Sequence, residues 1–327
     1  MNASQPNTGR MRAYFEFLVA FVYFFVARSL AHNGALGLAR EQWTLAQWTP
    51  LIDQAMLVFL LLLGYAGMGV ALDHELHPLQ AQGFPRRAGW QQETGLGVAF
   101  GWALAVACVL PLLVGGGIAI VLILGLSAWG WLVADAAFFA LVALAEEIAF
   151  RGYGFQRFAH AVGPVGAAVG FAIFYAIVQS LLPGSIHVTF AVSLAFSLVL
   201  STAYLRTHAL WVSWGINFGW KASRALLFGL AIGGDNSHSP VVQGNPMGPF
   251  WLTGGGFGLD SSWVTLIFLL AALPVVFRLT REMNNRTNAP ENVPGTVPGN
   301  LPVDLDVPAP QPAASEPPST NQPPTAN

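Results

Sequence analysis

The sequence predicts an all-α fold, a polytopic transmembrane helical bundle of about eight spans, and two observations support this prediction. First, 54% of the 327 residues are apolar, only 9% are charged, and the mean hydropathy is +0.55. Soluble domains carry about 25% charged residues, so a soluble protein of this composition would expose too much apolar surface. Second, eight apolar stretches approach the ~20 residues that a helix needs to cross a bilayer.

The eight expected spans are separated by polar or glycine-rich segments. They lie at about residues 14–31, 51–72, 95–114, 129–150, 165–182, 188–205, 210–232 and 263–277. No convincing cleavage site follows the first span, which favours a retained helix over a signal peptide. The run 118–126 follows the helix breaker Gly115-Gly116-Gly117 and is interpreted as a half-helix or as part of the next span.

Within three of these spans, glycines recur four residues apart. The pairs are Gly97 and Gly101, Gly166 and Gly170, and Gly215 and Gly219. Small residues at this spacing let two helices approach closely, and we expect the pairs to serve packing inside the bundle.

Basic residues are distributed unevenly between the two ends of the expected spans. With the N-terminus in the cytoplasm, ten arginines fall on the cytoplasmic side, namely Arg10, Arg12, Arg86, Arg87, Arg151, Arg157, Arg206, Arg278, Arg281 and Arg286. The outer loops hold only Arg28 and Arg40. Cytoplasmic loops are enriched in Lys and Arg, so the sequence predicts a multi-pass protein of the cell membrane with both termini cytoplasmic.

Composition and charge divide the chain into four expected segments. Residues 1–12 form a cytoplasmic N-terminal segment, 13–128 hold the first transmembrane helices, and 129–283 form a core with intramembrane polar residues. Residues 284–327 hold 11 of the 22 prolines and predict a disordered tail, interpreted as a solvated linker rather than a docking segment. The 14 Lys and Arg against 16 Asp and Glu provide no basic surface for nucleic acid.

Several ionisable or amide side chains lie inside the core spans. They are Asp135, Glu146, Glu147 and Arg151 near 129–150, Gln179 in 165–182, and Asn217, Lys221 and Arg224 in 210–232. An ionisable residue in a bilayer costs ~2.5–3.5 kcal/mol, so each one needs a partner or a function. At a rise of ~1.5 Å per residue, Glu146, Gln179, Asn217 and Lys221 lie at similar depths. We therefore expect one shared cavity lined by Glu146, Gln179 and Asn217.

Residue types alone leave two interpretations of this cluster. In the first, the acids and cations neutralise each other as a buried ion-pair network that locks two helices together. Lys221 or Arg224, or Arg151 on the same helix, would then lie within salt-bridge reach of Glu146 or Glu147. In the second, a glutamate activates water and polar side chains stabilise an oxyanion, as in a hydrolytic site.

The run Glu146-Glu147-Ile-Ala-Phe-Arg151-Gly resembles the EExxxR signature of the CPBP family of intramembrane proteases, which includes CAAX prenyl endopeptidases and bacteriocin-processing or immunity proteins. Residues 204–220 and the glycine-rich run 248–260 resemble later segments of the same family. The resemblance covers about residues 129–270 and implies a CPBP-protease-like core. It also implies a water-activating glutamate, histidines that bind zinc or another divalent metal or assist proton transfer, and an asparagine that stabilises the oxyanion.

The chain departs from this family at three positions. Gln179 and Asn217 stand where the family has histidines, and Lys221 stands where it has asparagine. Amides are poor zinc ligands and do not shuttle protons near neutral pH. The sequence therefore does not identify a cofactor. A lysine paired with a glutamate would also weaken that glutamate as a base. The seven histidines fall in loops or at span ends, so none obviously replaces a missing motif histidine. His187 is the one that we single out as a candidate replacement.

Two hypotheses about function follow. In the first, the protein is a CAAX-type intramembrane endopeptidase that uses Glu146 as general base, supported by Glu147 and Arg151, with Gln179, Asn217 and Lys221 completing the site. In the second, it is a catalytically inactive pseudoprotease that acts as a membrane binding or scaffold protein. Either way, the expected partners are the lipid bilayer and a hydrophobic or lipid-modified peptide or membrane protein.

Overall fold

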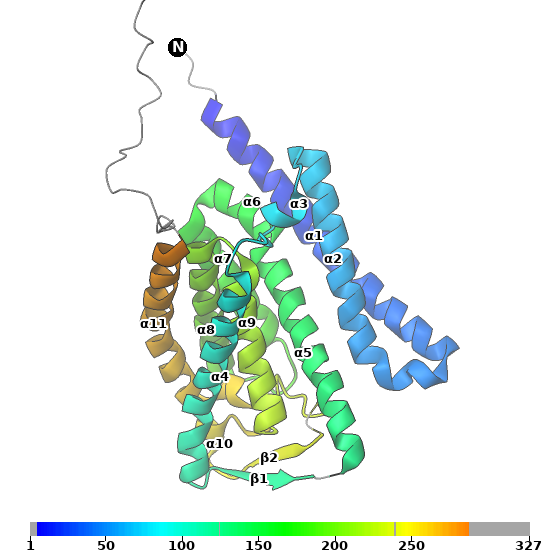
Figure 1. The fold of residues 1–327 in the computed structure, drawn as a ribbon, viewed down its shortest axis with the longest axis vertical. Helices are drawn as coiled ribbons and strands as arrows, with labels where there is room; N and C mark the ends of the chain where they lie inside the picture. Colours follow the sequence, from blue (N-terminus) through cyan, green and yellow to red (C-terminus); the bar gives the residue numbers. More distant parts are fainter. Residues whose placement is uncertain (1–4, 124, 239, 288–327) are drawn as a thin grey trace, which may run out of the picture. The chain divides into compact units, whose positions relative to one another are not determined.

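The computed structural model describes residues 5–123, 125–238 and 240–287, which form a helical bundle (Figure 1). Six helical segments in this part of the chain are long and apolar enough to cross a membrane: Gly9–Glu41, Trp43–Asp73, Trp90–Val114, Leu126–Val162, His187–Thr207 and Trp263–Arg281. The protein is therefore a multi-pass membrane protein, and the predicted all-α class is confirmed.

The elements follow one another in this order along the chain. The helices are α1 (Gln5–Glu41), α2 (Thr49–Asp73), α3 (Pro78–Ala81), α4 (Trp90–Val114), α5 (Leu126–Arg151), α6 (Tyr153–Val162), α7 (Pro164–Ser180), α8 (His187–Thr207), α9 (Leu210–Ala222), α10 (Phe250–Thr253) and α11 (Trp263–Thr287). Short 3-10 turns lie at Trp43–Trp48, Gly255–Phe257 and Leu259–Ser261, and a π-helical turn, Ser223–Leu227, continues α9. The strands are β1 (Ile118–Leu122) and β2 (Val242–Pro246).

Each of the eight expected spans corresponds to a helix, but two of these helices are shorter than the rest. Helix α7 has 17 residues, and α9 with its π-helical turn ends at Leu227, five residues before the expected limit. Gly229, with φ of 66°, lets the chain turn there, and its carbonyl accepts a hydrogen bond from Gly244 N–H. The expectation of helix through residue 232 is therefore wrong.

The run after the triple glycine is a strand, so its interpretation as a half-helix or part of the next span is wrong. Strand β1 pairs with β2 in antiparallel register, with Ile118 opposite Pro246 (Figure 1). Its β-branched side chains favour extended backbone, and the glycines before it end α4. The partner strand lies more than 100 residues away in the sequence, where no local pattern points to it.

Both terminal helices are longer than expected. Helix α1 has 37 residues, whereas the expected first span covered only 14–31. Helix α11 continues to Thr287, beyond the expected start of the proline-rich tail at 284. The remaining tail residues, 288–327, lie outside the described residues, so the predicted disorder stays a prediction.

Helices α4 and α9 pack closely along a seam of four glycines. A Cβ atom added to Gly97 or Gly101 would overlap backbone atoms of α9, and one added to Gly215 or Gly219 would overlap backbone atoms of α4. These two pairs thus serve internal packing, as predicted. The seam fixes α9 in the bundle, and α9 also packs against α5.

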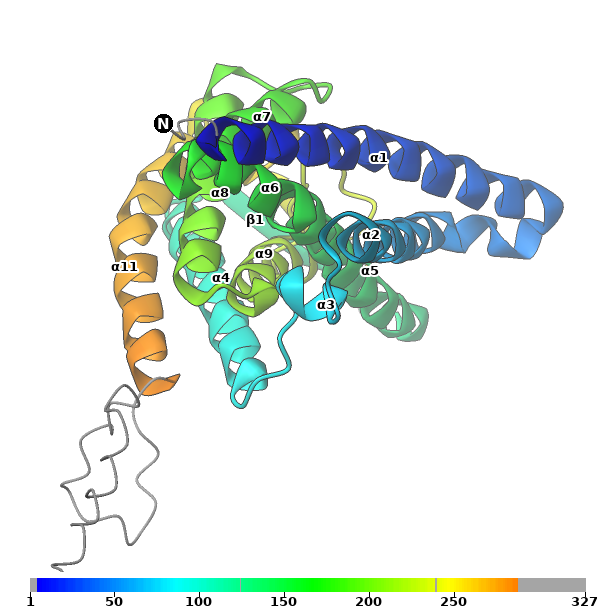
Figure 2. The ribbon, with the colours of Figure 1, turned by 90° about the horizontal axis from the view of Figure 1, so that it is seen from above.

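The α1–α2 hairpin lies along one side of the bundle (Figure 2). Helix α1 packs against α6, and α2 packs against α5. Four charged side chains join these helices at one end: Arg157 lies 3.0 Å from Asp73 and 3.6 Å from Glu16, which Arg12 reaches at 2.6 Å. This network fixes the hairpin against α6, the helix that directly follows α5 in the chain.

Candidate functional site

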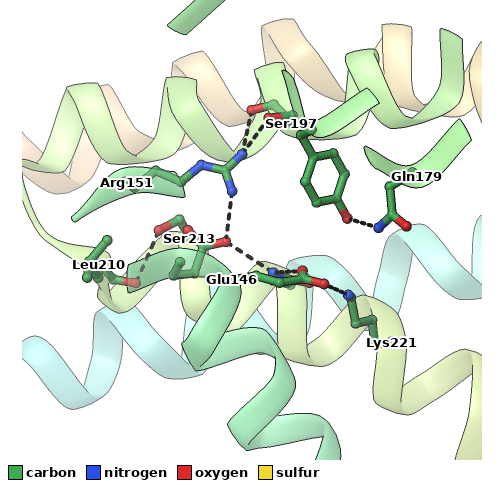
Figure 3. A network of polar contacts seen from close by, with 10 residues as sticks. Glu146, Arg151, Gln179, Ser197, Leu210, Ser213 and Lys221 are labelled. Atoms are coloured by element: carbon green, nitrogen blue, oxygen red, sulfur yellow. Dashed lines mark hydrogen bonds and ion pairs between the residues drawn. The ribbon is translucent and has the colours of Figure 1, made fainter. Parts of the chain in front are cut away.

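Helices α5 and α9 are joined inside the bundle by an ion pair. Lys221 Nζ lies 2.5 Å from Glu146 Oε1, and Asn217 Nδ2 donates a hydrogen bond of 2.9 Å to Glu146 Oε2 (Figure 3). Asn217 and Lys221 are four residues apart on α9, so one helix face reaches both carboxylate oxygens. The ion pair expected between the two spans is present, and both oxygens of Glu146 are hydrogen-bonded.

The neighbouring acid, Glu147, forms a fully buried ion pair with Arg151. Arg151, one helical turn later, places Nη1 3.3 Å from Glu147 Oε1. Arg151 Nη2 donates to the Ser197 carbonyl oxygen at 3.0 Å and to the Ser197 hydroxyl oxygen at 2.7 Å, and these bonds join α5 to α8 (Figure 3). Asn217 also donates to Glu147 Oε1 at 3.1 Å and so bridges the two glutamates. Glu147 and Arg151 therefore support the position of Glu146.

A polar cavity of about 240 Å³ opens beside Glu146. Its polar lining comes from α2, α5, α7, α8, α9, the turn that follows α9 and the loop segments that follow: Gln54, Glu146, Tyr175, Gln179, Ser193, Lys221, Arg224, Asp235, His238 and Asp260. A second cavity of about 370 Å³ lies between the α1–α2 hairpin and helices α5 and α7, with mostly apolar walls. The two cavities share Glu146 in their lining.

Two of the three residues expected to line a common cavity do so. Glu146 and Gln179 line both cavities, and Gln179 Nε2 donates a hydrogen bond of 2.8 Å to the Tyr175 hydroxyl (Figure 3). Asn217 has no exposed surface, does not line the cavity, and donates to Glu146 from within the helix packing. It therefore acts through the carboxylate rather than at the cavity wall, which corrects the expectation for this residue.

Further ionisable groups of the polar cavity come from residues that the sequence did not place there. Arg224 Nη1 lies 2.8 Å from Asp260 Oδ1, so this arginine pairs with the glycine-rich segment and not with a glutamate of α5. His238 Nδ1 lies 2.8 Å from Asp135 Oδ1. His187 begins α8 and is not part of the cavity lining. The sequence signal for His238 was Asp135, an acid inside an expected span that required a partner and had none assigned.

The residues around Glu146 do not fit a zinc or other divalent metal site. Within the described part of the chain, no three His, Cys, Asp or Glu side chains gather as metal ligands would. The groups nearest Glu146 are the Asn217 amide and the Lys221 ammonium, and an ammonium has no lone pair for a metal. Amides are also weak ligands for zinc.

Apolar helices long enough to cross a bilayer, with a polar cavity among them, define a multi-pass membrane protein with a candidate site inside its helical bundle. Residues 127–223 match the family described as Rce1-like, type II CAAX prenyl endopeptidase Rce1-like. This segment runs from α5 to the end of α9 and contains every residue from Glu146 to Lys221 discussed above. The match confirms the resemblance to the CPBP proteases for this part of the chain. No curated protein and no solved structure matches the chain.

Proposed function

We propose that this protein binds a hydrophobic or lipid-modified peptide, or a segment of a membrane protein, in the cavity beside Glu146 and does not hydrolyse it. The supporting features are the family match, the multi-pass bundle and the two adjoining cavities, one polar and one apolar. An apolar group of the ligand would lie between the α1–α2 hairpin and α5, and its polar part would lie near Glu146.

The pairing of Glu146 is the observation that carries this proposal. A general base needs a carboxylate oxygen within hydrogen-bond reach of the water proton that it abstracts, and each partner that already holds the carboxylate restricts this approach. Here Lys221 holds one oxygen at 2.5 Å and Asn217 holds the other at 2.9 Å. The ammonium also compensates the charge of the carboxylate, so Glu146 is held as one partner of an ion pair. The site is therefore better suited to holding a polar group than to activating water.

A binding and cleavage experiment on one preparation tests this proposal. The full chain in liposomes is incubated with a fluorescent farnesylated CAAX-type peptide, and bound and cleaved peptide are measured together. We expect saturable binding without cleavage, both with and without a metal chelator. An unmodified, non-farnesylated peptide serves as the control for the apolar group. Cleavage that is lost in Glu146→Gln would overturn the proposal, and so would the absence of any binding.

Peptide hydrolysis is the second candidate function, and one observation favours it. Asn217 Nδ2 and Lys221 Nζ are both hydrogen-bond donors that lie against Glu146. Donors of this kind stabilise the oxyanion of a tetrahedral intermediate when they face it. In such a mechanism, Lys221 would leave Glu146 on substrate binding, and Glu146 would then activate water. The cleavage arm of the same experiment decides between the two functions.

A further inference from the structure

Tyr175 places an incompletely paired hydroxyl in the wall of the polar cavity. Its side chain is almost fully buried, and its ring packs edge-on against Phe150 with a centroid distance of 5.1 Å. The hydroxyl oxygen accepts the hydrogen bond of 2.8 Å from Gln179 Nε2 (Figure 3). Tyr175 lines both the polar and the apolar cavity, as Glu146 does.

Among the residues that the structure describes, the hydrogen of this hydroxyl meets no acceptor. A phenol donates one hydrogen bond and accepts others, and Gln179 fills only the accepting side. Within the part of the chain that the structure describes, the Tyr175 hydroxyl donates to no other group. A donor left unpaired in a low-dielectric site is costly, so such a group needs water or a ligand. Among the described residues, the Glu146 carboxylate accepts hydrogen bonds from Lys221 and Asn217 and not from Tyr175.

We propose that the Tyr175 hydroxyl donates a hydrogen bond to a backbone carbonyl oxygen of the bound peptide. This inference rests on the proposed function and adds a specific binding contact to it. A peptide backbone suits the site because its carbonyls are strong neutral acceptors, while the cations Lys221 and Arg224 are already paired with Glu146 and Asp260. Tyr175 is a neutral donor and does not disturb those ion pairs.

Gln179 is a positioning residue in this arrangement. Its amide holds the phenol oxygen from one side, so the hydroxyl hydrogen is directed away from Gln179 and toward the cavity. The two residues lie four apart on α7, which keeps them on one helix face. Gln179 thus has a role that does not require the metal-binding or proton-shuttling chemistry of a histidine.

A chemical double-mutant cycle tests the contact. Tyr175→Phe removes only the hydroxyl and keeps the ring against Phe150. Its dissociation constant for the farnesylated peptide is compared with that of the unmodified chain, using a series of peptides in which one carbonyl at a time is replaced by a methylene group. We expect Tyr175→Phe to weaken binding of the full peptide about five- to tenfold, as for a lost neutral hydrogen bond. For the one peptide that lacks the partner carbonyl, the two proteins should bind equally.

Tyr204→Phe is the matched control variant. Tyr204 is likewise buried, and its hydroxyl accepts a hydrogen bond of 2.8 Å from Gln156 Nε2, but it lines neither of the two cavities around Glu146. We expect it to leave the dissociation constant unchanged. Gln179→Leu should weaken binding about two- to threefold, because the hydroxyl remains but is no longer oriented.

The outcomes separate this inference from the proposed function. If the unmodified chain binds no peptide, the proposed function fails. If it binds peptide and Tyr175→Phe binds every member of the series equally well, the hydroxyl serves water only and the inference is overturned. An equal loss of affinity for every peptide in the series would also overturn it, because a carbonyl partner must be specific. Thermal unfolding of each variant in detergent checks that the fold is retained.

Discussion

Lys221 and Glu146 join α9 to α5 through an ion pair of 2.5 Å at the edge of a cavity inside the bundle. The lysine side chain is 6% exposed and the glutamate side chain is 20% exposed, so the pair is buried on one side and faces the cavity on the other. A pair in this position both stabilises the packing of the two helices and occupies the carboxylate that the family resemblance assigns to water activation.

Removing the lysine should destabilise the protein. In Lys221→Ala, Glu146 keeps the Asn217 hydrogen bond but loses its compensating charge. Breaking a fully buried pair costs ~3–5 kcal/mol, and partial exposure of Glu146 to the cavity should reduce the loss here to about 2–3 kcal/mol. The measurement is unfolding in detergent. Arg40→Ala, at an exposed position on α1, is the control and should change stability little.

The double variant Lys221→Met with Glu146→Gln identifies the cause of that loss. If a stranded charge is responsible, the double variant should be more stable than Lys221→Ala, because neither charge remains. If the double variant is as unstable as the single one, packing and not charge explains the effect.

Restoring the family residues should restore peptidase chemistry if the three departures explain inactivity. The variant combines Gln179→His, Asn217→His and Lys221→Asn, which frees Glu146 from the ammonium and adds two imidazoles near it. Imidazole binds zinc and transfers protons near neutral pH, which the amides do not. We expect cleavage of the farnesylated peptide by this variant.

Two controls define that result. Glu146→Gln in the triple background should abolish the new cleavage, because the base is then missing. A chelator should abolish it if the histidines act as metal ligands. Cleavage by the unmodified chain at the same rate would contradict the premise that the histidines are needed.

Hydropathy predicted the helical class because an apolar stretch that is long enough to cross a bilayer satisfies its backbone hydrogen bonds within one helix. It failed at residues 118–122, since a strand of five residues depends on a partner at 242–246 that no local pattern reveals. Helix spacing and depth predicted that Lys221 or Arg224 of α9 and its turn, or Arg151 of α5 itself, would meet an acid of α5. They did not determine which one, because a π-helical turn carries Arg224 and directs it to Asp260. Such a turn has no strong sequence signal.

The α4–α9 seam should be intolerant of side chains. A Cβ on Gly219 would overlap backbone atoms of α4, so Gly219→Ala must push the helices apart. Overpacking of this kind costs about 1–3 kcal/mol. The variant should also weaken peptide binding, because α9 carries Asn217 and Lys221. Gly130→Ala on α5 is the control, since its Cβ would meet no atom within 4 Å. Equal stability of the two variants would show that the seam has no special role.

The predicted orientation places both termini, and Arg157 with them, in the cytoplasm. Arg12 and Arg157 both pair with Glu16, and the Arg206 guanidinium lies over the Phe277 ring of α11, 4.6 Å from its centroid. These contacts involve arginines of the expected cytoplasmic set, which the positive-inside rule assigns to one side of the membrane. The loop with Asp235 should be on the opposite side.

Reporter fusions after Arg157 and after Asp235 measure this: we expect cytoplasmic activity from the first and non-cytoplasmic activity from the second. Two fusions on the same side would contradict the arrangement, and exchanged sides would show that the bundle is inserted the other way round.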